Sequence, residues 1–146
     1  MFKIVSTMDE LLRALTVRAV VFIGEQHCPY ALEIDEHEYG SIHILGEING
    51  EPVAAARLRF PGPYAKLERI AVRQEWRGCG YGHALVDFMI EQAKLRGFHT
   101  FKMHAQAYLV DFYAQHGFVR HGDLFDEAGI DHYLMIRQDS PVLQKP

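Results

Sequence analysis

The sequence contains few cysteines, no long apolar run and no excess of positive charge, and each absence excludes a class of protein. Only Cys28 and Cys79 are present among 146 residues, and they form no metal-binding or redox motif. Two free thiols are typical of a cytoplasmic protein. No segment is apolar for long enough to be a signal peptide or to span a membrane. The formal net charge of −4, without a basic stripe, argues against nucleic acid as a partner.

The chain has nine histidines, but their spacing does not indicate a metal site. Three pairs lie fairly close in the sequence: His27 and His37, His99 and His104, His116 and His121. None has the spacing of a helical H-E-x-x-H motif or of a Cys/His zinc site. We therefore expect no metal cofactor.

What is present is the composition of one globular domain, with 49% hydrophobic and 23% charged residues. No internal repeat, low-complexity tract or interdomain linker divides it. We expect a single domain over residues 1–138, followed by a polar, proline-containing tail over 139–146 that is flexible. The sequence leaves the oligomeric state open, with a homodimer among the options.

The most informative stretch runs from Leu67 to Gly82 and reads L-E-R-I-A-V-R-Q-E-W-R-G-C-G-Y-G. Its first part is apolar and β-branched, which favours a buried strand. Three glycines at alternate positions then leave the backbone bare, and an amphipathic helical pattern follows directly after Gly82. The order is strand, bare loop and helix N-terminus. Free N–H groups and the helix dipole make such a terminus an anion site that suits a pyrophosphate.

Three phosphate-binding motifs compete for this stretch. A P-loop requires Lys and Ser or Thr after the last glycine, and Gly82 is followed by neither. A dinucleotide-binding motif requires G-x-G-x-x-G and an acidic residue about 20 positions later, whereas the spacing here is G-x-G-x-G. The third pattern, R-x-x-G-x-G, is met by Arg77, Gly80 and Gly82.

The rest of the chain predicts alternating strands and helices. Thr7 and Glu10 form a capping box before a helix, and Asn49-Gly50 is a strong hairpin signal. The expected elements are a strand at 2–5, a helix at 8–25, an acidic loop with one helical turn at 27–38, strands at 42–48, 52–60 and 67–72, a helix from 82 to about 96, a strand at 100–105, a helix at 108–116, and strands at 119–125 and 132–137. This order predicts a mixed α/β domain with three layers.

With its L-x-x-I-A-V strand, the R-x-x-G-x-G loop and the downstream F-Y-x-x-x-G-F, the chain resembles the GNAT superfamily of acyl-CoA-dependent N-acetyltransferases. Two further segments, V-F-I-G-E-Q-H-C-P-Y at 21–30 and A-Q-A-Y-L-V-D-F-Y-A-Q-H-G-F at 105–118, resemble its ElaA-like subgroup. The resemblance implies an α/β/α domain whose two central strands splay apart. Acyl-CoA enters the opening, where its pantetheine amides pair with exposed strand backbone, as in β-augmentation.

The resemblance also implies where acetyl-CoA binds. The strand backbone at Ile70, Ala71 and Val72 faces pantetheine, and the loop Arg77, Gly78, Cys79, Gly80, Tyr81 and Gly82 wraps the pyrophosphate. Many family members place an asparagine seven residues before the catalytic tyrosine, where this chain has Gln106. Glutamine carries the same donors and acceptor, so Gln106 is a candidate pantetheine contact.

Acetyl transfer to an amine requires a proton acceptor for the ammonium, stabilisation of the thioester oxygen and a proton for the thiolate. By the resemblance, Tyr113 is the acid, and a phenol is protonated at neutral pH. The oxyanion donor is a backbone N–H near 70–72. Glu68 is the candidate base, because strand alternation places it on the side of Ile70 and Val72. Its rivals are Glu33, Asp35 and His104.

The function that follows is direct acetyl transfer from acetyl-CoA to a primary amine in a ternary complex. Carboxylates from the 27–38 segment and from the final hairpin flank the predicted acceptor entrance, which favours a cationic amine; Glu33 and Asp35 are the candidate substrate-binding residues. Solvation of two surface loops is the alternative account of these carboxylates. Alternative functions are a non-catalytic acyl-CoA-binding sensor or interaction module and, more distantly, an autoinducer synthase. Cys79 lies in the phosphate loop, so no acyl-enzyme is expected.

Overall fold

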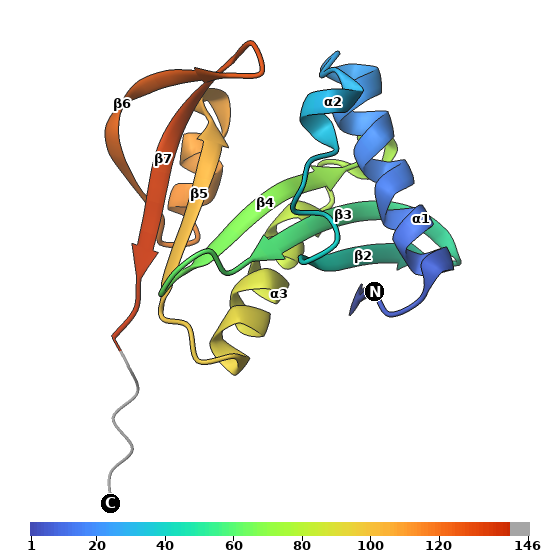
Figure 1. The fold of residues 1–146 in the computed structure, drawn as a ribbon, viewed down its shortest axis with the longest axis horizontal. Helices are drawn as coiled ribbons and strands as arrows, with labels where there is room; N and C mark the ends of the chain where they lie inside the picture. The colour runs from blue at the N-terminus through green and yellow to red at the C-terminus, as the bar shows by residue number, and fades with distance from the viewer. Residues whose placement is uncertain (141–146) are drawn as a thin grey trace, which may run out of the picture.

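In the computed structural model, which describes residues 1–140, one seven-stranded sheet runs through the molecule in the order β1-β2-β3-β4-β5-β7-β6 (Figure 1). Only the β4–β5 pair is parallel, and all other neighbours are antiparallel. The strands are β1 (Phe2–Ile4), β2 (Ile42–Ile48), β3 (Glu51–Arg59), β4 (Ala65–Val72), β5 (Thr100–Gln106), β6 (Val119–Glu127) and β7 (Ile130–Gln138). The predicted mixed α/β class is confirmed.

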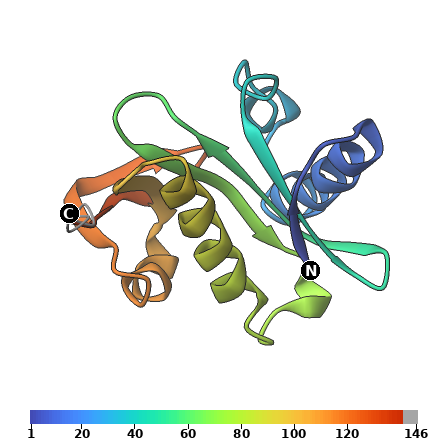
Figure 2. The same ribbon diagram turned by 90° about the horizontal axis from the view of Figure 1, so that it is seen from below.

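Helices cover the sheet on both faces (Figures 1 and 2). The larger core lies between the sheet, α3 and the α4 segment, and the smaller core lies under α1 on the opposite face. The helices are α1 (Met8–Arg18), α2 (Tyr30–Glu33), α3 (Tyr81–Leu95) and α4 (Val110–Ala114). Within residues 1–140, no helix is both long and apolar enough to cross a membrane.

Local sequence signals account for several element boundaries. The Thr7 hydroxyl accepts a hydrogen bond from the Glu10 N–H at 3.1 Å, and the Glu10 carboxylate accepts one from the Thr7 N–H at 3.1 Å. This is the predicted capping box. Asn49 and Gly50 both have positive φ, as a two-residue hairpin turn of this type requires. The helix predicted over 8–25 is an α-helix over Met8–Arg18 and continues as a π-helix over Ala19–Glu25.

A bulge in β4 separates the two central strands. Between the pairs Ala55–Ala71 and Arg57–Glu68, β4 has one residue more than β3, and Arg69 takes φ +54°. Its parallel pairing with β5 is limited to positions 65–66, so the two strands diverge beyond that point (Figure 1). The backbone of β4 facing β5 is therefore free of a strand partner from position 67 onward.

The same bulge overturns one prediction. Strand alternation places Glu68 on the face of Ile70 and Val72, but Ile70 and Val72 pack against the core under α3. Glu68 instead pairs across the strands with Arg57, on the face covered by α1 and α2. An extra residue between them reverses the alternation.

The C-terminal part of the chain also differs from the prediction. The final hairpin turns tightly at Ala128-Gly129, so Asp126, Glu127 and Asp131 lie on strand ends and not in a long loop. Within the predicted tail 139–146, Asp139 is anchored, since its N–H donates to the His99 carbonyl at 2.7 Å. The remainder of the predicted tail, 141–146, lies outside the described residues.

Candidate active site

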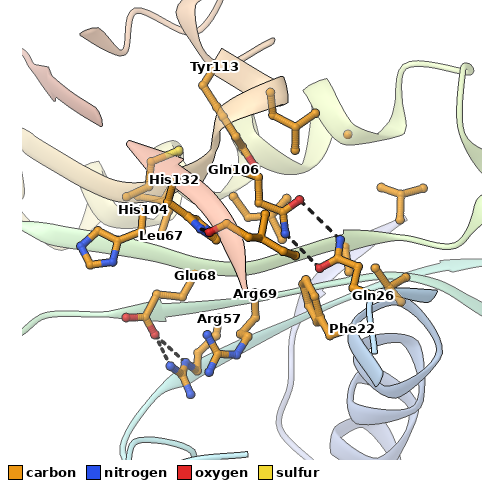
Figure 3. Close-up of a pocket in the computed structure, with 18 of the residues that line it drawn as sticks. Phe22, Gln26, Arg57, Leu67, Glu68, Arg69, His104, Gln106, Tyr113 and His132 are labelled. Carbon is orange, nitrogen blue, oxygen red and sulfur yellow. Dashed lines mark hydrogen bonds and ion pairs between the residues drawn. The ribbon is translucent and has the colours of Figure 1, made fainter. Parts of the chain in front are cut away.

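A cavity of about 920 Å³ opens where β4 and β5 part. It is continuous from the loop before α3, past the diverging strands, to the face that carries α2 and the end of the β6–β7 hairpin. Figure 3 shows the middle of this cavity, with Tyr113 on one side and Glu68 and Arg57 on the other. The bulge explains its existence, because the diverging strands leave room that no side chain fills.

The loop before α3 is suited to an anion. Gly80 is the N-cap of α3 with φ +86°, a conformation that L side chains rarely adopt, and a Cβ there would meet nothing within 4 Å. By position, the first N–H groups of the helix have no intrahelical acceptor, which suits an anion. At Gly82 a Cβ would lie 3.3 Å from the Phe112 ring, so a larger residue would press on that side chain. These residues fit a diphosphate held by backbone donors.

The other predicted loop residues contribute unequally. Arg77, Gly78, Gly80, Tyr81 and Gly82 line the cavity, whereas Cys79 does not line it. The Arg77 guanidinium donates to the Val72 carbonyl at 2.8 Å and pairs with Glu25 at 2.9 Å. Its side chain thus ties the loop to the end of β4 and to the π-helix.

Tyr113 is buried in the cavity wall, with 6% of its surface exposed. Burial raises the pKa of its hydroxyl well above the ordinary value, and the neighbouring Tyr108 adds to the shift. The phenol therefore stays protonated throughout the physiological range. The Phe112 ring packs edge-on against the Tyr113 ring, with 5.0 Å between the ring centroids, and restrains it.

Gln106, the predicted pantetheine contact, lines the cavity and forms a reciprocal amide pair that sequence reasoning missed. Its Nε2 donates to the Gln26 Oε1 at 2.9 Å, and Gln26 donates back at 3.4 Å (Figure 3). The Tyr108 hydroxyl donates to the same Gln106 oxygen. Gln26 ends the π-helix, 80 residues away in the sequence, so no local pattern could have revealed this partner.

Glu68 lies in the cavity lining but is held by three cations. Arg57 pairs with it most closely, Arg59 lies at 2.8 Å and Lys66 at 3.2 Å. Burial alone would raise the pKa of Glu68, but the hydrogen bonds and charges of Arg59 and Arg57 outweigh it and lower the pKa to about 2. A carboxylate of such low pKa is a weak proton acceptor at neutral pH.

The two predicted substrate-binding carboxylates are also paired. Glu33 is 2% exposed, and its Oε1 lies 2.8 Å from the Arg18 Nε and 3.4 Å from the Arg69 Nε. Asp35 accepts from both terminal nitrogens of Arg57, at 2.7 and 3.0 Å. Both residues line the cavity, but their charge is balanced by arginines from α1, β3 and β4.

A histidine–carboxylate cluster stands on the same face, across the diverging strands. The His104 Nδ1 lies 2.9 Å from the Glu127 Oε1, and the His132 Nε2 lies 3.6 Å from the other oxygen of Glu127. The hydrogen bond from His104 is the main cause that lowers the pKa of Glu127. All three residues line the cavity, and Phe125 packs against both imidazoles. Sequence reasoning named His104 as a rival base but missed its partners.

No group of three or more His, Cys, Asp or Glu side chains within residues 1–140 has the arrangement of a metal site. The cavity is lined by acids, bases and backbone donors of this chain. Those groups converge on one opening from β4, β5, α4 and the loop before α3.

Comparisons with known proteins place the chain in a family. Residues 12–138 match the model of the acetyltransferase (GNAT) domain. The Bacillus subtilis protein YjcF, described as an uncharacterized N-acetyltransferase, is 38% identical over 130 residues, which cover 88% of this chain and 93% of that protein.

Two solved structures extend the comparison. Escherichia coli ElaA is 28% identical with a TM-score of 0.85, over 94% of this chain and 99% of its own. A GNAT family acetyltransferase from Elizabethkingia anophelis, solved with acetyl-CoA bound, shares the fold at 14% identity and a TM-score of 0.74, over 94% and 97% of the two chains. The chain belongs to the GNAT acetyltransferases and is an acyl-CoA-dependent N-acetyltransferase.

Proposed function

We propose that this enzyme transfers an acetyl group from acetyl-CoA to a primary amine by direct attack in a ternary complex. One observation carries the proposal: a single cavity joins the anion-binding loop of α3 to the opposite face of the sheet through the opening between β4 and β5. Such a passage can admit acetyl-CoA from one side and an amine from the other. Direct attack then needs no covalent acyl-enzyme.

In this proposal Tyr113 protonates the departing thiolate. It is the buried phenol of the cavity wall, and its raised pKa keeps the proton available for donation. On its side facing β5, the β4 backbone at Ile70, Ala71 and Val72 has no strand partner and supports a pantetheine arm, and an N–H of that stretch stabilises the thioester oxygen. Gln106 contributes a side-chain amide to the same passage.

Two residues are candidates for the proton acceptor. Glu68 remains the sequence-based candidate, although three cations lower its basicity. His104 has the more suitable environment. A carboxylate only accepts hydrogen bonds, so Glu127 fixes the proton on the His104 Nδ1 and leaves Nε2 to receive one. Imidazole is the side chain best matched to proton exchange near neutral pH.

The acceptor is proposed to be cationic. Support comes from Asp126 and Asp131, which are exposed at the end of the β6–β7 hairpin and form no ion pair among the described residues. Glu127 beside them lines the cavity itself. Glu33 and Asp35 contribute less than the sequence alone suggests, because arginines neutralise them. The preference therefore rests on the hairpin side of the entrance.

Turnover with acetyl-CoA and a panel of primary amines tests the proposal, with release of free CoA thiol as the readout and mass spectrometry of the acetylated product as confirmation. Mass spectrometry of ligands that co-purify with the protein would identify the bound acyl-CoA. Binding of acetyl-CoA without acetylation of any amine would favour the alternative, a non-catalytic acyl-CoA sensor. Absence of acetyl-CoA binding would overturn both.

A further inference from the structure

Two histidines and an aspartate form a hydrogen-bonded chain that the proposed mechanism does not use. His83 lies in the first turn of α3, and its Nδ1 is 2.8 Å from the Nε2 of His116. The Nδ1 of His116 is 3.0 Å from the Oδ1 of Asp87, one turn further along α3. The His116 side chain is only 7% exposed, whereas the Asp87 carboxylate is 70% exposed. The chain thus runs from solvent, through a buried imidazole, to His83.

The chemistry of the three groups fixes their protons. The Asp87 carboxylate can only accept, so the His116 Nδ1 carries a hydrogen. One hydrogen lies between the His116 Nε2 and the His83 Nδ1. When the pair is neutral, His83 supplies that hydrogen and its Nε2 is a bare acceptor. When the pair gains one proton, the His83 Nε2 carries an N–H, whichever of the two rings bears the charge.

The position of His83 makes this change relevant to the substrate. His83 lines the cavity beside Gly80 and Gly82, at the N-terminus of α3. The Phe112 ring stacks on the imidazole at 4.4 Å and holds its orientation. Among the described residues the His83 Nε2 has no hydrogen-bond partner, and it is not one of the enclosed unpaired nitrogens. It is therefore free to meet a ligand in the cavity.

We propose that the His83–His116–Asp87 chain recognises the diphosphate of CoA and couples its binding to the uptake of one proton. The inference rests on the proposed function, since it takes the α3 loop as the diphosphate site. An anion at the helix N-terminus favours the protonated pair, whose outward group is an N–H donor. His83 is the contact residue, and His116 and Asp87 are positioning residues that stabilise the added charge.

The other charged groups near the chain do not replace this role. The Arg137 Nη1 donates to the His116 carbonyl at 2.9 Å, and its own charge is balanced by Asp139. Arg77, at the start of the loop, is paired with Glu25. Within residues 1–140, Asp87 has the only carboxylate that is hydrogen-bonded to either imidazole. Proton uptake should therefore report on the two histidines.

Isothermal titration calorimetry in buffers of different ionisation enthalpy measures the protons taken up on binding. CoA and 3′-dephospho-CoA are the probes, because the 3′-phosphate monoester of CoA itself titrates near pH 6 and dephospho-CoA lacks it. We expect uptake of a substantial fraction of a proton at pH 7.5 for the wild type. We also expect its affinity to rise about tenfold between pH 8 and pH 6, the scale of one charge-assisted hydrogen bond.

Three variants and one control sharpen the test. His83→Gln/His116→Gln keeps amide donors that cannot titrate, so proton uptake should vanish while binding persists. His116→Asn and the surface variant Asp87→Asn should reduce uptake without touching the ligand. His121→Asn, an exposed histidine outside the cavity, should behave as wild type. Circular dichroism would establish that each variant is folded.

The outcomes separate the inference from the proposed function. Equal proton uptake in wild type and His83→Gln/His116→Gln, with either ligand, would overturn the inference and leave the acetyl-CoA site standing. If dephospho-CoA does not bind, the proton uptake of wild type and of that variant is compared with CoA as the ligand, and the same criterion applies. Failure of the wild type to bind CoA and acetyl-CoA would overturn both.

Discussion

At the scale of single residues, Tyr113 gives the most direct prediction. Tyr113→Phe removes only the hydroxyl that is proposed to donate the proton and keeps the ring in the buried cavity wall. We expect kcat to fall by about 10²-fold or more, as for loss of a general acid, with the Kd for acetyl-CoA nearly unchanged. Because burial raises the pKa of Tyr113, its ionisation should not appear in the alkaline limb of the rate profile. Turnover equal to wild type would reduce Tyr113 to a packing residue.

The proton acceptor is tested by a matched pair of variants, His104→Gln and Glu68→Gln. If His104 is the base, His104→Gln should lower kcat/KM for an alkylamine about 10²-fold and abolish the acidic limb of its pH profile. The same variant should be almost unimpaired with hydroxylamine, which is already unprotonated at neutral pH. Kinetic profiles with both acceptors check this. Loss of the acidic limb in Glu68→Gln and not in His104→Gln would return the role to Glu68.

Residues within the local motifs could be predicted from the sequence, and residues whose roles depend on distant partners could not. Tyr113 and Gly80 follow from short patterns, and the structure places both on one cavity. Glu33 and Asp35 also reach the cavity, but their arginine partners come from other elements and cancel their charge. The Gln26–Gln106 pair likewise joins residues 80 positions apart.

At the scale of elements, the loop before α3 can be tested with a control of equal strain. Gly80→Asp places a side chain and a negative charge in the proposed diphosphate site, so acetyl-CoA binding should be lost. Gly122→Asp, in β6, shares the positive φ and the open surroundings but lies outside the cavity. Each variant should lose about 1 kcal/mol of unfolding free energy to backbone strain.

Calorimetry of acetyl-CoA binding and urea unfolding of both glycine variants check this prediction. Gly122→Asp should bind like wild type. Unchanged affinity in a folded Gly80→Asp would refute the assignment of the loop.

The ion network that ties α1 and the α2 segment to the sheet should make folding sensitive to acid. Burial works to raise the pKa values of Asp35, Glu38 and Glu68, but Arg18, Arg57 and Arg59 outweigh it and lower each to about 2. A carboxyl whose pKa is lower in the folded chain contributes stability above its ordinary value near 4, and that contribution is lost toward pH 2. The urea midpoint should therefore fall steeply between pH 4.5 and pH 2.

Two glutamate substitutions separate this network from ordinary surface pairs. Glu38→Gln leaves the buried Arg18 and Arg57 less compensated, so it should cost about 3 kcal/mol of unfolding free energy at pH 7 and much less at pH 2.5. Glu51→Gln breaks an exposed pair with Arg73 and should cost under about 1 kcal/mol at either pH. Equal losses at pH 7 and pH 2.5 for Glu38→Gln would contradict the linkage.

Elements can be predicted where hydrophobic periodicity agrees with a capping or turn signal. The capping box marks the start of α1, and Asn49-Gly50 marks the hairpin turn. The bulge at Arg69 was not, because a non-glycine residue with positive φ leaves no mark in the pattern of apolar residues. That one residue decides which side chains share a face with Glu68. The pattern of apolar residues therefore predicts the strand but not its local geometry.

Over the whole molecule, the distribution of charge bears on the proposed cationic acceptor. Five carboxylates and five arginine or lysine side chains line the cavity, so the lining is neutral on balance: Glu25, Glu33, Asp35, Glu68 and Glu127 against Arg57, Arg59, Lys66, Arg69 and Arg77. Attraction of a cation must then come from the entrance and from the net charge of −4. Such long-range attraction is weakened by salt.

The acceptor prediction follows from that distribution. Polyamines and lysine-containing peptides should be acetylated faster than acidic amino acids. This rate advantage should shrink by about tenfold or less as salt rises from about 0.05 to about 0.5 M, because salt screens the long-range attraction. Asp126→Asn/Asp131→Asn should reduce the advantage without loss of stability, because both side chains are exposed and unpaired within residues 1–140. Glu36→Gln, on the opposite segment, is a comparison variant whose exposed carboxylate lies 3.6 Å from His37, and it should change the advantage less. A panel of amines assayed at both salt concentrations decides the matter. Faster transfer to acidic amino acids, or rates for polycationic amines that ignore both salt and the hairpin carboxylates, would show that the acceptor is selected by shape inside a neutral cavity and not by charge at its entrance.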